Sequence, residues 1–219
     1  MIGIVVALKS EIKYFLENIT PNKIYNFYNK KVFEFSLNNN NCVLIISGIG
    51  KVNSALSTQF LIDKYNVKTI INIGTCGCLD KNANIGDIFS VDRAIQFDFD
   101  LTELDNVLIG YIQDYDTNFF KATNKLNFQA KTLASLDKFS KNEEDINKMI
   151  NLGVCLKDME GASILQVTTT NNVESIMLKV VSDIYGKQEM TKQYYKNLAY
   201  CSNVISENLM NIICNENFV

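Results

Sequence analysis

The chain of 219 residues contains no histidine and no tryptophan, and it has one proline, Pro21, and one arginine, Arg93. The lack of histidine excludes every mechanism that depends on an imidazole base and removes a common zinc ligand. Its six cysteines are irregularly spaced, with only Cys76 and Cys78 close together, which indicates free thiols in a reducing compartment rather than a metal site. We therefore expect no metal and no other cofactor.

Long apolar runs and a basic bias are also missing. No run reaches the ~18 apolar residues of a membrane-spanning helix. The opening segment MIGIVVAL has no basic leader before it, which argues against a signal peptide. The net charge is -3 and the lysines are scattered, so there is no electrostatic footprint for nucleic acid. We expect a cytoplasmic protein whose partners include neither nucleic acid nor a membrane.

Apolar patterning predicts alternating strands and helices. Hydrophobic residues make up 47% of the chain, and no linker or repeat interrupts residues 1–219, so we expect a single domain. Apolar runs bounded by turn residues predict buried strands at residues 2–8, 42–47, 69–74, 88–95, 130–135, 153–157 and 175–182. Residues 31–37 alternate and predict a more exposed antiparallel strand. Helical periodicity appears at 10–18, with Ser10 as N-cap, and at 52–65, 160–170 and 192–214.

This alternation indicates the α/β class. Buried strands that alternate with helices predict a single-domain three-layer αβα sandwich around a mixed, mostly parallel central sheet. In such sheets, ligands bind beyond the carboxyl ends of the strands. We therefore expect the functional residues just after the strands.

Two candidate segments follow the first strands. Glu11 stands in the first turn of the expected helix at 10–18, where the helix dipole favours a carboxylate, and it is either catalytic or a simple charge complement. The loop Ser47-Gly48-Ile49-Gly50-Lys51 could bring backbone N–H groups to a ligand. It lacks the spacing of a P-loop, and an ordinary strand-to-helix turn explains it equally well.

Three further segments carry candidates. Small residues after the strand at 69–74 would allow close approach of a ligand. Glu160 opens a helix and could cap it or accept hydrogen bonds from sugar hydroxyls, with Met159 beside it. Asp183 follows the buried run at 177–181, and partial desolvation there would raise its pKa and let it hold a proton near neutral pH. A turn aspartate is the ordinary alternative.

Taken in order, these segments resemble the nucleoside phosphorylase/nucleosidase family, in its 5'-methylthioadenosine/S-adenosylhomocysteine nucleosidase branch. The resemblance runs from residue 1 to about residue 200. It is carried by IGIVVAL with Glu11, SGIGKVNSA at 47–55, INIGTCGCL at 71–79, GDI at 86–88, QFDFDLT at 96–102, ASLDKF at 134–139, DMEGAS at 158–163 and VSD at 181–183. It implies hydrolysis of the N-glycosidic bond of an adenine nucleoside, such as 5'-methylthioadenosine, S-adenosylhomocysteine or 5'-deoxyadenosine.

The resemblance also implies catalytic roles. Asp183 would protonate N7 of adenine, with Ser182 holding its carboxyl group, and Glu11 would orient and deprotonate the attacking water. The chemistry suits two carboxyl groups in different environments, because the leaving base needs a proton while the ribose develops positive charge.

Binding roles are implied for the remaining positions. Glu160 would bind the ribose hydroxyls, Met159 would pack on the sugar and Phe139 would stack on the purine. The backbone around Phe139 and Ser140 would read the adenine edge, and Ile49 would line the 5' pocket. The residues that would approach the ligand from the strand end are Thr75, Cys76 and Gly77.

Several alternatives stay open. Phosphorylases of this family hold phosphate with several arginines, whereas this chain has only Arg93, so water is the favoured nucleophile over phosphate. Departures from the family pattern at Leu136, Ser140 and Ile184-Tyr185 leave the substrate open. The rivals are a purine nucleoside phosphorylase, a futalosine-type hydrolase, a non-catalytic nucleoside-binding protein and an α/β domain without chemistry here. The resemblance further implies a homodimer in which residues 97–115 of one subunit close the other's pocket.

Overall fold

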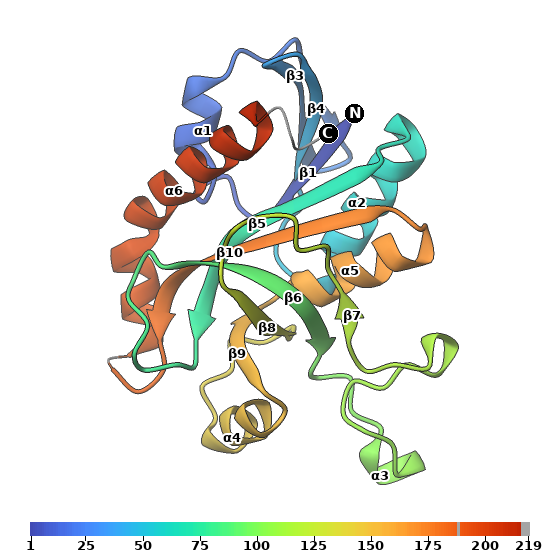
Figure 1. Cartoon of the computed structure of the whole chain (residues 1–219), viewed down its shortest axis with the longest axis vertical. Coiled ribbons are helices and arrows are strands. Elements are labelled where there is room, and N and C mark those ends of the chain that lie inside the picture. The colour runs from blue at the N-terminus through green and yellow to red at the C-terminus, as the bar shows by residue number, and fades with distance from the viewer. Residues whose placement is uncertain (188, 216–219) are drawn as a thin grey trace.

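The computed structural model describes residues 1–187 and 189–215, and its centre is one ten-stranded mixed sheet with helices on both faces (Figure 1). The strands are β1 (Ile2–Val6), β2 (Lys23–Phe27), β3 (Lys30–Leu37), β4 (Asn40–Ile46), β5 (Thr69–Cys78), β6 (Ile88–Gln96), β7 (Phe120–Lys121), β8 (Ala130–Ser135), β9 (Val154–Asp158) and β10 (Glu174–Ile184). The helices are α1 (Lys13–Asn18), α2 (Lys51–Tyr65), α3 (Thr102–Asp105), α4 (Glu143–Asn151), α5 (Gly161–Thr170) and α6 (Met190–Cys214), with a 3₁₀ turn, η1 (Gln113–Tyr115).

Strand alternation divides the core between the two faces of the sheet. On β1, Ile4 packs with Phe15 of α1 and Leu209 of α6, whereas the next residue, Val5, packs with Leu61 of α2 and with α5. The period of two along a strand produces this division. The expected α/β fold, with a mixed sheet between helical layers, is confirmed.

One part of the sheet is more closed than a flat sandwich. β10 pairs in parallel with β5 and antiparallel with β6, and the order β6-β8-β9-β5 completes a ring of five strands. The closure rests on β5 and β10, which are paired in parallel from Thr69 and Glu174 to Cys78 and Ile184. Both strands therefore extend beyond their predicted ends.

This extension changes where the expected site residues lie. Thr75, Cys76 and Gly77 lie inside β5, and Asp183 lies inside β10, rather than after the strands as predicted. Ser182 lies inside β10, as its predicted strand implied. The β5–β10 register shifts between Val181 and Asp183, so that Asp183 pairs with Gly77. Irregularities of this kind re-aim side chains next to functional sites.

The helix at 10–18 also begins later than predicted. α1 starts at Lys13 with Ile12 as its N-cap residue, so Ser10 is not the cap and Glu11 lies before the helix. The sequence patterns missed β2, β7, α3 and α4. Among the described residues, no helix is long and apolar enough to cross a membrane.

Candidate active site

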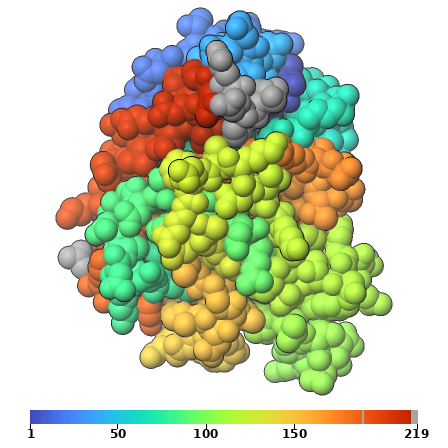
Figure 2. Space-filling model, viewed as in Figure 1, coloured from blue at the N-terminus to red at the C-terminus, as the bar shows by residue number. Residues whose placement is uncertain are grey.

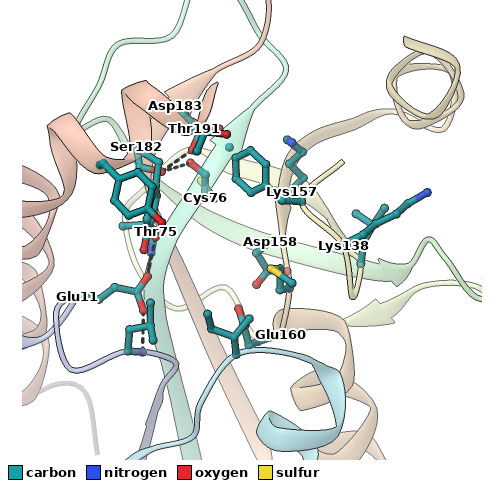
Figure 3. A pocket seen from close by; sticks show the side chains of 18 residues that line it. Glu11, Thr75, Cys76, Lys138, Lys157, Asp158, Glu160, Ser182, Asp183 and Thr191 are labelled. Carbon is teal, nitrogen blue, oxygen red and sulfur yellow. Dashed lines mark hydrogen bonds between the residues drawn. The ribbon is translucent and has the colours of Figure 1, made fainter. Parts of the chain in front are cut away.

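A cavity of about 350 Å³ opens beside β5 and β10 (Figure 3). Every expected site residue except Ser140 lines it. The full lining is Leu8, Glu11, Ile49, Thr75, Cys76, Gly77, Leu136, Lys138, Phe139, Lys157, Asp158, Met159, Glu160, Ser182, Asp183, Thr191, Tyr194 and Tyr195. A space of this size, largely apolar with a few convergent polar groups, suits a small organic ligand.

Glu11 is held rigidly although it lies outside a helix. One carboxylate oxygen, Oε2, accepts a hydrogen bond from the Leu8 N–H at 3.1 Å. The other, Oε1, accepts from the backbone N–H of Thr75 at 2.8 Å and from its hydroxyl at 2.6 Å. Gly74 makes this approach possible, because a Cβ there would lie 3.3 Å from Oε1. The carboxylate is thus fixed against β5 and faces the cavity.

Asp183 is the buried carboxyl group farther along the same strand pair, and only 1% of the residue is exposed. Its Oδ1 accepts a hydrogen bond from the Ser182 hydroxyl at 2.7 Å, and Oδ2 is buried without a hydrogen-bond partner. Burial raises the pKa of Asp183, although the Ser182 hydrogen bond and the charge of Lys157 oppose this effect. A carboxyl group in these surroundings is suited to carry a proton.

A buried ion pair supports the opposite wall. Lys179 of β10 contacts Asp158 at 2.8 Å, and both side chains are almost completely buried. Asp158 also accepts hydrogen bonds from the Gly161 N–H at 2.8 Å and the Ser135 hydroxyl at 2.5 Å. The negative charge of Asp158 next to Glu160 is therefore compensated by a cation beneath it.

Glu160 precedes α5 and does not cap that helix with its side chain. Its Oε1 instead accepts a hydrogen bond from the Gly50 N–H at 2.9 Å, which ties the loop before α2 to the cavity. Burial and the charge of Asp158 raise the pKa of Glu160, and Lys179 works against this rise. Glu160 and Glu11 contribute oxygen atoms to the same cavity (Figure 3).

Two half-exposed apolar side chains lie at the cavity mouth. Ile49 is 46% exposed and Phe139 is 45% exposed. The loop that carries Ile49 is held by the Glu160 contact and by Asp137, which accepts a hydrogen bond from the Lys51 N–H at 2.8 Å.

Ser140 is the expected site residue that does not reach the cavity. It is 5% exposed, its N–H donates to the Lys138 carbonyl at 2.9 Å, and its carbonyl accepts from the Lys157 ammonium. Ser140 therefore does not line the cavity as expected, and its carbonyl is bonded to Lys157, whereas Phe139 before it does line the cavity.

Sequence patterns missed several residues of the wall. Lys157 and Asp158 close the strand β9, in a segment that could line a pocket, but the sequence assigned a role to neither of them. Their contacts are with residues far away in the chain. Thr191, Tyr194 and Tyr195 come from the first turns of α6, after the last quoted segment of the resemblance at 181–183. Among the described residues, no group of three histidine, cysteine or carboxylate side chains could hold a metal ion.

Comparison with known proteins places this site in a family. Opposed carboxyl groups in one cavity are the arrangement expected of proteins that break or make glycosidic bonds. The family model of the phosphorylase superfamily matches residues 1–213. A 5'-methylthioadenosine/S-adenosylhomocysteine nucleosidase of Staphylococcus haemolyticus is 30% identical, and the match covers 97% of this chain and 100% of that protein. The chain therefore belongs to the phosphorylase superfamily and, within it, to the 5'-methylthioadenosine/S-adenosylhomocysteine nucleosidases, which confirms the resemblance.

Solved structures share the fold. The S-adenosylhomocysteine nucleosidase of Streptococcus pyogenes, solved with 5-methylthiotubericidin, aligns with a TM-score of 0.87 at 22% identity over 98% of this chain and 96% of that one. A futalosine hydrolase of Helicobacter pylori aligns with a TM-score of 0.88 at 23% identity over 95% and 94%. These likenesses establish the common fold.

The buried ion pair under Glu160 generates a stability prediction. Lys179→Met would leave Asp158 charged and unpaired in the interior, so we expect the free energy of unfolding to fall by about 3–5 kcal/mol. Lys125→Met is the matched control, because Lys125 contacts Glu174 at 2.6 Å but its side chain is 51% exposed. The control should cost about 1 kcal/mol or less. Equal losses in urea unfolding would contradict the prediction.

Proposed function

We propose that this chain hydrolyses the N-glycosidic bond of an adenine nucleoside, such as 5'-methylthioadenosine, S-adenosylhomocysteine or 5'-deoxyadenosine, to adenine and the 5-substituted ribose. The observation that carries this proposal is the pairing of two differently held carboxyl groups, Asp183 and Glu11, in one cavity. The nearly full-length match to a nucleosidase of this specificity supports it.

Asp183 acts as the general acid. It donates a proton to N7 of the purine as the C1'–N9 bond breaks, so that the base leaves as a neutral molecule. Burial raises the pKa of Asp183, which keeps the proton available, and the Ser182 hydroxyl fixes the carboxyl group in place. Acid catalysis of this kind contributes ~10²–10⁴ in rate.

Glu11 acts on the other reactant. It accepts a proton from water, whose oxygen bonds to C1', and its negative charge stabilises the oxocarbenium-like sugar. Leu8 and Thr75 hold this carboxylate in place with backbone and hydroxyl hydrogen bonds. Thr75, Cys76 and Gly77 of β5 form the cavity floor between the two carboxyl groups.

Further wall residues bind the substrate. Glu160 accepts hydrogen bonds from the ribose hydroxyls, and Met159 packs on the sugar. Phe139 stacks on the purine at the mouth, and Ile49 covers the 5'-substituent. No metal or cofactor takes part in this proposal.

The position of the single arginine favours water over phosphate as the nucleophile. Arg93 lies on β6, where it contacts the Thr132 hydroxyl at 3.3 Å and the Phe119 ring at 4.4 Å, and it is not part of the cavity wall. The carboxylate of Glu11, at the place proposed for the nucleophile, would oppose a phosphate ion. Because the thiols of all six cysteines are free, we place the reaction in a reducing compartment, the cytoplasm.

Cleavage should therefore not depend on phosphate. With 5'-methylthioadenosine in phosphate-free buffer, we expect adenine and 5-methylthioribose as products, because water supplies the hydroxyl group at C1'. Product chromatography with and without added phosphate measures this directly. A requirement for phosphate, with formation of a ribose 1-phosphate, would contradict hydrolysis and support the phosphorylase alternative.

Substitution of either carboxyl group should slow the reaction. Asp183→Asn removes the proton donor and Glu11→Gln removes the base, and each should lower kcat by about 10²–10⁴-fold. Thermal unfolding should show both variants folded. Asp63→Asn, on the exposed face of α2 and outside the cavity wall, is the matched control and should retain parent activity. Parent-like turnover in Asp183→Asn would refute the role of that residue.

The acid role also fixes the direction of the pH dependence. The proton on Asp183 must be present for reaction, so kcat/KM should fall as the pH rises through the pKa of this residue. Burial shifts that pKa above the ordinary value of 3.8, and the decline therefore begins at higher pH than for an exposed aspartate. A pH profile of kcat/KM for 5'-methylthioadenosine measures this, and a rate that increases with pH over the same range would be inconsistent with it.

We further propose a homodimer in which residues 97–115 of one subunit close the other's pocket. Figure 2 shows this segment within a lobe that projects from one side of the molecule. It exposes apolar side chains, among them Phe99, Leu104 at 79% and Leu108 at 66%. Such exposure is typical of an association surface.

The dimer proposal predicts a coupled loss. Leu104→Asp should shift sedimentation from dimer toward monomer and lower kcat/KM in parallel, because the pocket loses its cover. Ile24→Asp is the control, because Ile24 is also an exposed aliphatic residue (51%) but lies on β2, outside this segment. It should change neither the sedimentation nor kcat/KM. A fully active monomer would rule out this part of the proposal.

A further inference from the structure

Lys157 is a buried cation in the cavity wall that the proposed reaction does not use. It pairs with Gly77 across the antiparallel β5–β9 contact and is 6% exposed. A Cβ on Gly77 would lie 2.8 Å from Lys157 Cε and 2.9 Å from Asp183 Oδ2, so the two side chains meet above this glycine. Lys157 and Asp183 are therefore neighbours on the same part of the wall (Figure 3).

The contacts of Lys157 fix the position of its ammonium group. Nζ donates a hydrogen bond to the Ser140 carbonyl and lies 4.7 Å from the centre of the Phe139 ring. An ammonium group has three donors and no acceptor, so it has further N–H groups to offer a ligand. These contacts place donor groups beside the ring on which the purine would stack.

The edge of the purine that faces Asp183 carries two groups. N7 and the substituent at C6 lie on the same edge, where adenine presents an acceptor and an amino donor, and a 6-oxopurine presents two acceptors. Lysine is suited to the two acceptors, whereas an amino group needs an acceptor opposite it. The Ser140 carbonyl, one of the backbone groups expected near the adenine edge, accepts a hydrogen bond from Lys157.

We infer that Lys157 is a specificity-determining residue that lets this cavity accept nucleosides with a 6-oxopurine base, through an N–H hydrogen bond to O6. The inference rests on the proposed function, because it uses Asp183 at N7 and Phe139 on the ring face. The reaction is unchanged: the C1'–N9 bond breaks, Asp183 supplies the proton for the leaving base, and water supplies the hydroxyl group at C1' and a proton to Glu11.

The test compares 5'-methylthioadenosine with 5'-methylthioinosine, which replaces the C6 amino group with an oxo group. We expect the parent protein to cleave both. Lys157→Met should lower kcat/KM for 5'-methylthioinosine relative to 5'-methylthioadenosine by about tenfold or more, the usual effect of removing a charged hydrogen-bond donor. The ratio is the decisive quantity, because any change in the protonation of Asp183 affects both substrates alike.

Two further variants sharpen the comparison. Lys157→Arg keeps a cationic donor and should retain cleavage of 5'-methylthioinosine. Lys131→Met is the matched control, since Lys131 also lies over an aromatic ring, 5.4 Å from the centre of Phe89, but outside the cavity wall. It should leave the ratio unchanged. If Lys157→Met does not fold, inhibition of the parent by free hypoxanthine and by adenine replaces it, and hypoxanthine should bind at least as tightly.

The outcomes distinguish the role of Lys157 from the hydrolase activity on which it rests. Cleavage of 5'-methylthioadenosine alone by the parent, or an equal loss for both substrates in Lys157→Met, would overturn the role of Lys157 and leave the hydrolase intact. Weaker inhibition by hypoxanthine than by adenine would also overturn it. Failure to cleave either nucleoside would instead refute the proposed function.

Discussion

The burial of Asp183, where β10 pairs with β5, is the constraint on which the site depends. Burial disfavours its charged form and raises its pKa, although the hydrogen bond from the Ser182 hydroxyl to one oxygen and the charge of Lys157 work against this rise. β5 and β10 stay paired as far as Cys78 and Ile184, and the register shift before Asp183 sets its side chain opposite Gly77. Strand pairing thus produces the burial that raises the pKa of Asp183, as the proposed reaction requires.

Charge is distributed unevenly around the same cavity. Glu11 is bonded by three donors, whereas Asp158 is compensated by Lys179 beneath the wall. Hydrogen bonds stabilise the charge of Glu11 and a buried cation stabilises that of Asp158, whereas Oδ2 of Asp183 has no hydrogen-bond partner. Carboxyl groups in contrasting surroundings can divide acid and base duties between them without histidine.

Local patterns in the sequence predicted much of the fold. The strand at 130–135 and the helix at 160–170 lie where apolar periodicity indicated, because burial of one face or one stripe determines both. α4 was missed although its signals are present: Asn142 accepts a hydrogen bond from the Glu144 N–H, and three acidic residues follow it. Lys157 could not be assigned to the site from sequence, because its position beside Asp183 arises from the non-local pairing of β9 with β5. Lys157 is also bonded to the carbonyl of Ser140, which does not line the cavity.

The protonation state of Asp183 is the quantity to measure. An infrared difference spectrum between the parent and Asp183→Asn, recorded near neutral pH with an unreactive adenine nucleoside analogue bound, isolates the signal of this one side chain. A carboxylic acid band that is lost in the variant is the predicted result. A difference spectrum containing only ionised carboxylate bands would show that Asp183 has no proton to give and would contradict the central claim.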